Sequence, residues 1–341
     1  MRFLKALFGI VVVLAILGAA AGGVGWVWFQ NEIVKDGPLA TDTVFSVTAG
    51  ETLISVASRA ETDGIISDDL LLRLHARFNG EETAIKVGEF SVPAAVSTSG
   101  FLSLLVAGDV IQYTITLPEG LTTAQILNRI DGDDRLLGEL PDPLPVEGSL
   151  LPETYAFTRD TKKSELIDRM TGAQETLMDN TWPDRADNLP ISSRQEALTL
   201  ASIVQKEAAG QDEYGNVASV FINRLERGMK LETDVSVHYG VNGGEPLYNR
   251  QGQRRTLYRS ELDRDTPYNT YTRTGLPPTP IANPGADAIQ AVLNPPETDY
   301  IFFVASGTTG SVFSTNYRDH QRAVADYRAY ERAEIERERS N

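Results

Sequence analysis

The feature that most constrains this chain is an apolar stretch near its amino terminus. Residues 6–30 contain no charged side chain and are rich in Val, Leu, Ile, Ala and Gly, whereas Arg2 and Lys5 precede them. A stretch of this length is long enough to cross a bilayer as a helix, which takes about 20 residues. We therefore predict a polar tip at residues 1–6 and a transmembrane helix over residues 7–29.

A cleaved signal peptide is the alternative interpretation of this stretch, because Ala19, Ala20 and Ala21 resemble a cleavage site. The apolar run continues beyond these alanines, and Trp26 and Trp28 lie where an aromatic belt at the membrane interface is expected. An uncleaved anchor is therefore the favoured interpretation.

Charges on the two sides of the predicted helix indicate its orientation. Arg2 and Lys5 precede it, and Glu32 and Asp36 follow it. Loops on the cytoplasmic side of a membrane carry an excess of Lys and Arg. We therefore expect a cytoplasmic amino terminus, with the bulk of the chain on the other side of the membrane.

Composition excludes several classes of function. The chain has 47 acidic and 31 basic side chains, a formal net charge of -16, so it lacks the basic surface expected of a nucleic-acid-binding protein. It contains no cysteine, which excludes disulfides, thiolate metal sites and cysteine nucleophiles. His75, His238 and His320 lie far apart and not in a zinc-type spacing. We expect no nucleic-acid partner, no metal site and no cofactor.

The rest of the chain mixes strand and helix patterns, and its 341 residues leave room for about two domains, so we predict an α+β fold. The expected parts are a linker, a small α+β unit, a connecting α+β part, a larger mixed α+β domain with a central helical hairpin, and a charged tail. These parts cover residues 30–43, 44–115, 116–190, 191–330 and 331–341.

The small unit begins with a recognisable pattern. Residues 45–57 alternate as a strand, turn at Gly50 and enter a helix. A short strand, then Gly-Glu-Thr-Leu, then a helix resembles the start of a LysM module, a fold associated with polymers of N-acetylglucosamine. The resemblance covers only the beginning of the unit. A small α+β scaffold without sugar contacts remains the alternative.

The predicted helical hairpin contains one carboxylate in an unusual place. Ser193 and Glu196 have the spacing of a capping box, which begins the first helix, and a second helix covers about 216–227 before Gly228. Glu207 falls on the edge of the first helix's apolar stripe. Burial disfavours the charged form of a carboxyl, and a raised pKa is what a general acid needs near neutral pH. The structural alternative is a helix-end glutamate whose head reaches water.

The segments after this hairpin are more irregular. Residues 240–274 are rich in Gly, Asn, Arg and Tyr, and a loop of that length is usually functional or disordered. A helix follows, for which we expect Asn283 as cap and Pro284 in the first turn. A β-hairpin over residues 300–314 and a final helix over residues 317–339 complete the chain.

Six motifs in the carboxyl-terminal half, weak singly, together carry a resemblance. They are Ala201-Ser-Ile-Val-Gln-Lys-Glu207, Val217-Ala-Ser-Val-Phe-Ile-Asn-Arg-Leu225, Thr233-Asp234, Pro267-Tyr-Asn-Thr-Tyr271, Gly275-Leu-Pro-Pro278 and Ile281-Ala-Asn-Pro-Gly285. In this order they resemble the YceG-like family of endolytic murein transglycosylases. The resemblance implies a single-pass inner-membrane protein whose periplasmic catalytic domain cuts nascent peptidoglycan glycan strands internally. It also implies association with murein synthases.

The resemblance assigns roles to particular residues. Glu207 ends the first motif, where the family has its catalytic glutamate, and Gln205 stands where relatives often have a second glutamate. Four further residues match motif positions expected to line the groove and bind substrate: Asp234, Asn269, Tyr271 and Asn283. Two departures are Ser311, where relatives commonly have a histidine, and the segment 240–264, which looks longer than usual.

A single catalytic carboxylate is sufficient for this chemistry. A glycosidase that uses water normally needs two carboxylates. A lytic transglycosylase instead uses the muramic sugar's own 6-hydroxyl as the nucleophile, and intramolecular attack has a large entropic advantage. The resemblance thus implies that Glu207 protonates the glycosidic oxygen between N-acetylmuramic acid and N-acetylglucosamine, then takes the 6-hydroxyl proton as the 1,6-anhydro ring closes.

Two alternatives belong to other functional classes. One is a non-catalytic peptidoglycan-binding scaffold at the inner membrane, in which Glu207 only packs. The other is a serine hydrolase that pairs Ser202 or Ser219 with His238 or His320. Neither serine has a nucleophile-elbow pattern around it.

Overall fold

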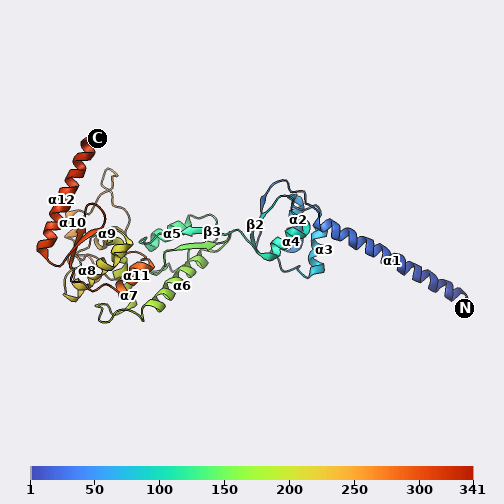
Figure 1. Cartoon of the computed structure of the whole chain (residues 1–341), viewed down its shortest axis with the longest axis horizontal. Helices are drawn as coiled ribbons and strands as arrows, with labels where there is room; N and C mark the ends of the chain where they lie inside the picture. Colours follow the sequence, from blue (N-terminus) through green and yellow to red (C-terminus); the bar gives the residue numbers. More distant parts are fainter. Residues whose placement is uncertain (1, 341) are drawn as a thin grey trace. The chain divides into compact units, whose positions relative to one another are not determined.

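The computed structural model describes residues 2–340, which form two compact units (Figure 1). Unit 1 comprises Met1–Tyr113 with Phe157–Asp160, and unit 2 comprises Thr114–Ala156 with Thr161–Asn341. Helices and short strands occur in both units, so the predicted α+β class is confirmed. The described strands form three two-stranded sheets, β1–β2, β3–β4 and β5–β6.

Unit 1 consists of one long helix followed by a small packed body. Its elements are α1 (Arg2–Val34), β1 (Thr43–Val47), α2 (Leu53–Thr62), α3 (Asp69–Asn79), β2 (Gly88–Val92) and α4 (Thr98–Ala107). β1 and β2 pair antiparallel with Phe45 opposite Phe90, and both rings are buried. Just before β2, the backbone N–H of Lys86 donates to the carbonyl of Leu105 at 3.0 Å.

Helix α1 contains a predominantly apolar 28-residue stretch, Leu7–Val34, which has Glu32 as its one charged side chain and is long enough to cross a membrane. The helix continues into the segment predicted as a linker. Its last turns do so because Phe29 and Ile33 are buried against Leu71 of α3. The end of α1 is therefore part of the packed body of unit 1.

Unit 2 holds the remaining elements, except that Tyr113 of β3 and Phe157 of β4 belong to unit 1. These elements are β3 (Tyr113–Thr116), α5 (Thr123–Asp131), β4 (Thr154–Phe157), α6 (Lys163–Thr181), α7 (Arg194–Glu207), the 3-10 helix η1 (Gln211–Glu213), α8 (Tyr214–Glu226), α9 (Asp234–Asn242), α10 (Arg259–Leu262), α11 (Ala286–Leu293), β5 (Phe302–Ala305), β6 (Ser311–Ser314) and α12 (Tyr317–Ser340). β5 and β6 pair antiparallel from Phe302 opposite Ser314, which confirms the β-hairpin predicted at residues 300–314.

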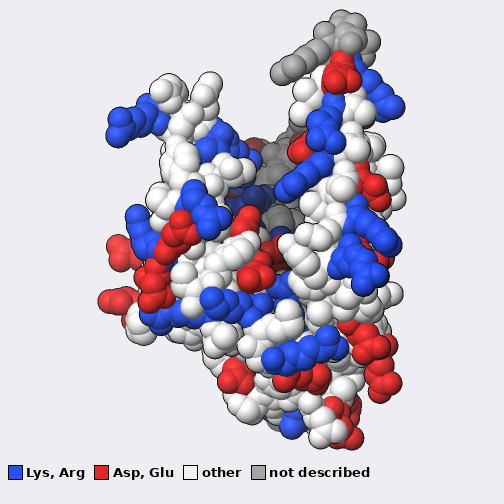
Figure 2. Space-filling model, turned by 90° about the vertical axis from the view of Figure 1, so that its left-hand side faces the viewer, with Lys and Arg blue, Asp and Glu red and all other residues white. Residues whose placement is uncertain are grey.

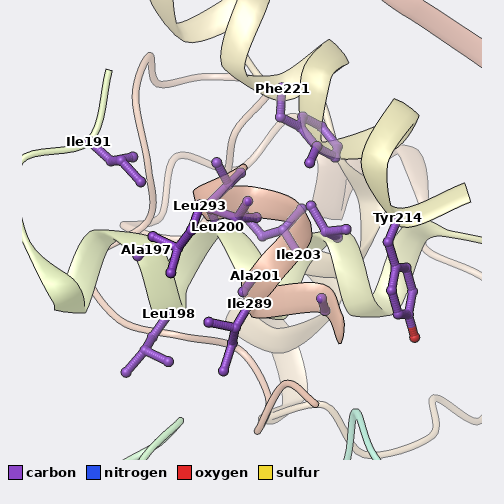
Figure 3. Close-up of a cluster of buried hydrophobic side chains, with 14 of the residues drawn as sticks. Ile191, Ala197, Leu198, Leu200, Ala201, Ile203, Tyr214, Phe221, Ile289 and Leu293 are labelled. Carbon is purple, nitrogen blue, oxygen red and sulfur yellow. The ribbon is translucent and has the colours of Figure 1, made fainter. Parts of the chain in front are cut away.

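The core of unit 2 surrounds α7. This helix packs against α8, α9 and α11, and every residue from Ala197 to Val204 is buried (Figure 3). The prediction of a single apolar stripe was therefore wrong. Thr199 and Ser202 are enclosed as well, and each hydroxyl donates to a carbonyl of its own helix. A helix buried on all sides is a central core element rather than a surface helix.

The structure confirms the helix start predicted at Ser193 but not the cap predicted at Asn283. Ser193 does cap α7, since its hydroxyl accepts the Glu196 N–H, but the Glu196 carboxylate accepts from the N–H of Ser192. α11 begins at Ala286 with Gly285 as its cap, so Asn283 is not the cap. The Asn283 side chain is buried and already bonded elsewhere in the core, which leaves the capping position to Gly285.

The enclosure of α7 predicts a large effect for truncating one of its side chains. Leu200→Ala should lower the free energy of unfolding by about 2–5 kcal/mol, because it leaves a cavity that neighbouring helices cannot fill. Chemical denaturation followed by circular dichroism measures this change. Leu144→Ala is the control, since Leu144 is 56% exposed. Equal effects of the two substitutions would contradict the enclosed position of α7.

Candidate active site

A cavity of about 350 Å³ lies at the carboxyl-terminal end of α7. Its lining residues come from α7, α8, the connection between α8 and α9, the loop before α11, β5 and α12. Figure 2 shows acidic side chains around a hollow in the face of the molecule viewed there, with Lys and Arg on the protruding segments at either side. The cavity is thus a meeting point of elements far apart in sequence.

Glu207, the last residue of α7, lies in this cavity as a half-buried carboxylate. Burial raises its pKa, and the neighbouring Asp234 raises it further. Hydrogen bonds from the Thr233 hydroxyl and the Val235 backbone, and the charge of Arg224, act in the opposite direction. Because burial is the largest contribution, the net direction is upward, and the raised pKa predicted for this carboxyl is confirmed.

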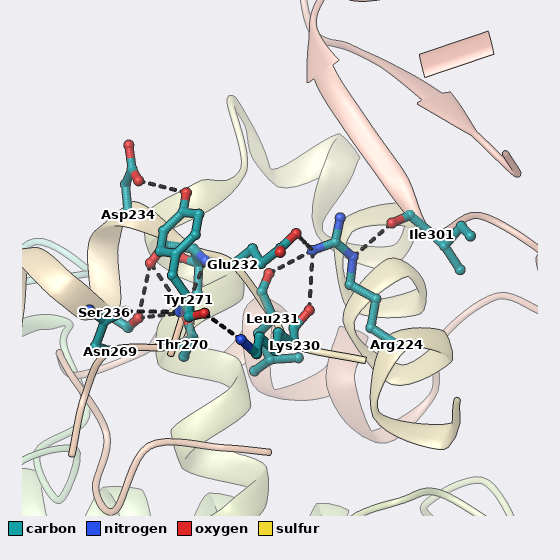
Figure 4. A network of polar contacts seen from close by, with 11 residues as sticks. Arg224, Lys230, Leu231, Glu232, Asp234, Ser236, Asn269, Thr270, Tyr271 and Ile301 are labelled. Atoms are coloured by element: carbon teal, nitrogen blue, oxygen red, sulfur yellow. Dashed lines mark hydrogen bonds and ion pairs between the residues drawn. The ribbon is translucent and has the colours of Figure 1, made fainter. Parts of the chain in front are cut away.

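Asp234 and Tyr271 line the same cavity and are bonded to each other (Figure 4). Asp234 is the first residue of α9, and the Tyr271 hydroxyl donates to its Oδ1 at 2.8 Å. Burial and this carboxylate raise the pKa of the Tyr271 phenol. Three of the five residues singled out from the sequence therefore meet at one site.

The other two predicted residues, Asn269 and Asn283, are buried and do not line the cavity. Asn269 donates to the carbonyls of Leu262 at 2.8 Å and Arg264 at 2.6 Å, and it accepts from the Tyr271 N–H at 2.9 Å. It thereby shapes the loop that carries Tyr271.

Asn283 occupies a separate polar cluster. Its Oδ1 accepts from the Leu150 N–H at 3.0 Å, and its Nδ2 donates to the Thr123 hydroxyl at 3.1 Å and to Glu147 at 3.2 Å. The amide therefore joins the segment before α11 to the segments around α5. A contact of either asparagine with substrate stays a prediction.

Arg224 is a cavity residue that the sequence reasoning did not select (Figure 4). Its guanidinium is buried, donates from Nε to the Ile301 carbonyl at 2.7 Å and from Nη1 to the Leu231 carbonyl at 2.8 Å, and is paired with Glu232 at 3.6 Å. Burial lowers its pKa. The sequence signal that could have identified Arg224 is its position on the apolar face of the helix predicted at about 216–227.

Glu232 brings a third carboxylate to the cavity, beside Glu207 and Asp234. Its φ of 51° lies in the left-handed region, which is costly for a residue with a side chain. Nothing about a glutamate in the sequence indicates this backbone conformation. Strained backbone of this kind concentrates at functional sites, so Glu232 is a candidate functional residue.

An aromatic wall faces these acidic groups. It consists of Phe302 from β5 with Tyr317 and His320 from α12, and the His320 ring is stacked on Phe302 with centroids 4.9 Å apart. Burial lowers the pKa of His320, and Arg224 lowers it further. Within residues 2–340 the buried Nδ1 of His320 has no hydrogen-bond partner. The sequence had suggested this histidine as the partner of a serine nucleophile, not as part of an aromatic wall.

Ser311, where relatives commonly have a histidine, lies outside this cavity. Its backbone N–H and its hydroxyl both donate to the buried carboxylate of Glu213, the hydroxyl at 2.9 Å. The two serines of the hydrolase alternative are also engaged elsewhere. Ser202 bonds to the Thr199 carbonyl, and Ser219 bonds to the Asn216 carbonyl.

The part of the chain that the structure describes contains no group of three or more His, Asp or Glu side chains arranged to hold a metal ion. The cavity offers a carboxyl with a raised pKa, two further carboxylates, a buried guanidinium and an aromatic wall. This set suits proton transfer to a polar, ring-shaped substrate.

Comparison with known proteins gives the family. Residues 45–326 match the YceG-like family. The chain belongs to the YceG-like family. An endolytic murein transglycosylase of Streptococcus pneumoniae serotype 2 strain D39 is 28% identical over 368 residues, covering 93% of this chain and 64% of that relative. The chain thus spans less than two thirds of the length of this pneumococcal relative.

Two further relatives match over more of their own length. An endolytic murein transglycosylase of Bacillus subtilis strain 168 is 27% identical over 318 residues, covering 84% of this chain and 85% of the relative. The crystal structure of a yceG-like protein from Listeria monocytogenes is 26% identical, with a TM-score of 0.50, and covers 82% of this chain and 98% of that one. This YceG-like chain therefore shares its fold with a solved family member.

The raised pKa of Glu207 predicts a pH-dependent cost in stability. A carboxyl whose folded pKa lies above its unfolded value of 4.5 costs nothing when protonated in both states, and stability is lost as pH rises through the folded pKa. Glu207→Gln removes that cost. We expect this variant to gain stability relative to the wild type as pH rises above 4.5 toward the raised pKa of the folded protein, measured by chemical denaturation.

Glu226→Gln is the matched control for this measurement. Glu226 is the last residue of α8, as Glu207 is of α7, but its side chain is exposed. Its replacement controls for the loss of a helix-end carboxylate as such. A stability difference between Glu207→Gln and wild type that is the same at every pH would show that the carboxyl titrates normally.

Proposed function

We propose that this YceG-like protein is a membrane-anchored endolytic lytic transglycosylase. In this proposal it cleaves the bond between N-acetylmuramic acid and N-acetylglucosamine in nascent peptidoglycan strands and leaves 1,6-anhydro-N-acetylmuramic acid ends. Family membership and the names of the two bacterial relatives support it. The observation that carries it is the carboxyl of Glu207, with a raised pKa, in a polar cavity at the end of a buried helix.

The proposed mechanism uses Glu207 twice. Its protonated form donates the proton to the bridging oxygen as the bond from the anomeric carbon to that oxygen breaks, and the N-acetylglucosamine chain leaves as an alcohol. The resulting carboxylate then accepts the proton of the muramic 6-hydroxyl, whose oxygen attacks the anomeric carbon. One proton leaves the carboxyl and one returns, so the acid is regenerated without water.

The neighbouring groups have distinct roles in this proposal. The transition state carries developing positive charge on the sugar ring, which the carboxylates of Asp234 and Glu232 stabilise electrostatically. Tyr271, bonded to Asp234, contacts the substrate beside the reacting ring, and the aromatic wall packs against sugar faces. Asn269 and Asn283 hold the surrounding loops.

The proposal also includes the location of the protein and the role of unit 1. We assign α1 as a single-pass inner-membrane anchor with a cytoplasmic amino terminus, which leaves the catalytic unit in the periplasm. The order β1, α2, α3, β2 with β1 and β2 paired supports a LysM-like unit that contacts glycan. Murein synthases, which make the nascent strands, are the expected protein partners.

Replacement of the proposed acid tests the reaction directly. Glu207→Gln should lower the rate of anhydro-product formation by at least about 100-fold, because general acid–base groups contribute rate factors of this size. Mass spectrometry of products from purified glycan strands measures the loss. Glu226→Gln should retain full activity, and both variants should still bind glycan in a pull-down.

Three results would contradict this assignment. Substantial activity of Glu207→Gln would place the acid elsewhere. Products with ordinary reducing ends would indicate hydrolysis, with Asp234 or Glu232 as a second catalytic carboxylate. Glycan binding without any product from the wild-type protein would favour the non-catalytic scaffold.

The hydrogen bond from Thr233 predicts a shift in the pH profile. The Thr233 hydroxyl lowers the pKa of Glu207, so Thr233→Val should raise that pKa further. A general acid works only while protonated, so the alkaline limb of the activity profile should move to higher pH, with at most about a tenfold change in maximal rate. Thr199→Val is the control, since that hydroxyl bonds within α7. An alkaline limb that stays in place or moves to lower pH would contradict the proposed role.

A further inference from the structure

Three aromatic side chains meet where α1 reaches the body of unit 1. Trp26 and Phe29 of α1 both contact Phe78 of α3, with ring centroids 5.3 Å and 5.6 Å apart. Phe29 is buried, but Phe78 is 59% exposed and Trp26 is 48% exposed. A large apolar side chain at the end of α3 is thus left uncovered directly beside the apolar helix.

Helix α3 runs back along α1 toward its amino-terminal side. Near the end of α1, Ile33 packs with Leu71 in the first turn of α3. About two turns earlier in α1, Trp26 contacts Phe78 in the last turn of α3. The carboxyl-terminal end of α3 therefore points back toward the apolar part of α1, and Phe78 lies level with Trp26.

The length of α1 determines how deep Trp26 and Phe78 lie in a bilayer. The 28-residue apolar stretch Leu7–Val34 is about 42 Å long at 1.5 Å per residue. The hydrocarbon core is about 30 Å thick, which about 20 residues span. Starting from Leu7, just after Lys5, the core ends near Trp26, and the turns that carry Phe29 and Ile33 lie beyond it.

We propose that the carboxyl-terminal end of α3 inserts into the lipid interface, with Phe78 beside Trp26, and holds the packed body of unit 1 on the membrane surface. This inference rests on the proposed anchor role of α1. Aromatic side chains favour the headgroup level of a bilayer, and the exposed Phe78 is continuous with the lipid-facing surface of α1.

The residues around Phe78 fit an interfacial depth. Arg77 is exposed beside it and suits lipid phosphate groups, whereas Glu81 and Glu82 follow and oppose deeper insertion. Gly80 ends α3 with a left-handed φ of 72°, so the chain turns away after Phe78. Only the tip of α3 enters the interface, and the rest of the packed body that follows α1 stays in water.

A single tryptophan at position 78 tests the proposal in the full chain. The chain has 3 tryptophans, so Phe78→Trp is combined with Trp26→Phe, Trp28→Phe and Trp182→Phe. The protein is reconstituted in phosphatidylcholine vesicles with or without brominated acyl chains, which quench nearby tryptophan. Ile54→Trp in the same background is the control, because Ile54 is 62% exposed and lies in the first turn of α2, outside the aromatic contacts that join α1 to the end of α3.

We expect the fluorescence of the Phe78→Trp protein to be quenched at least about twofold more strongly than that of the Ile54→Trp protein, since interfacial side chains lie within about 5–10 Å of the acyl boundary. If both proteins float with the vesicles and are quenched equally, the insertion of the α3 tip into the interface is contradicted. Membrane anchoring by α1 would still be supported. Protein that fails to float would overturn the anchor as well. The catalytic proposal is measured separately by anhydro-product formation.

Discussion

The enclosure of α7 on all sides determines where the carboxyl at its end lies. Ala197 to Val204 have no exposed face, so the helix cannot rotate or shift without disturbing α8, α9 and α11. Glu207 leaves this core at its last turn and meets the cavity. A surface helix would hold the same residue far less firmly, because solvent leaves one of its sides free.

The electrostatics of the cavity follow from this placement. Burial raises the pKa of Glu207, and Asp234 acts in the same direction, while Thr233 and Arg224 limit the effect. The guanidinium of Arg224 is itself held by backbone carbonyls and by Glu232, so it does not neutralise Glu207 directly. The partly buried carboxyl of Glu207 and the left-handed backbone of Glu232 both reduce the stability of the fold. Such a loss is usual at a preorganised site.

The sequence was informative where the signal is local or carried by a motif. The apolar amino-terminal stretch, the β-hairpin at 300–314 and the raised pKa of Glu207 were all predictable, and the motifs that contain Asp234 and Tyr271 assigned both residues to one groove. The enclosure of α7 was not predictable, because apolar periodicity within one helix does not reveal how many other elements surround it.

The residues that were assigned wrongly and the residues that were missed both depend on long-range contacts. Asn269 and Asn283 have the same side chain whether they bind a ligand or bridge buried backbone, and only the fold shows the second arrangement. Glu232 lies at the cavity with its backbone in the left-handed region. His320 lies there with its ring stacked on Phe302. No pattern in the sequence indicates either feature.

The bond between Glu213 and Ser311 has a mechanical consequence. The same carboxylate also accepts the N–H of Ala209, two residues after Glu207, so one side chain ties the β5–β6 turn to the segment that follows the acid. Thermal fluctuations then displace the two together. The distance between Glu207 and the stacked rings of Phe302 and His320 therefore changes little at that edge of the cavity.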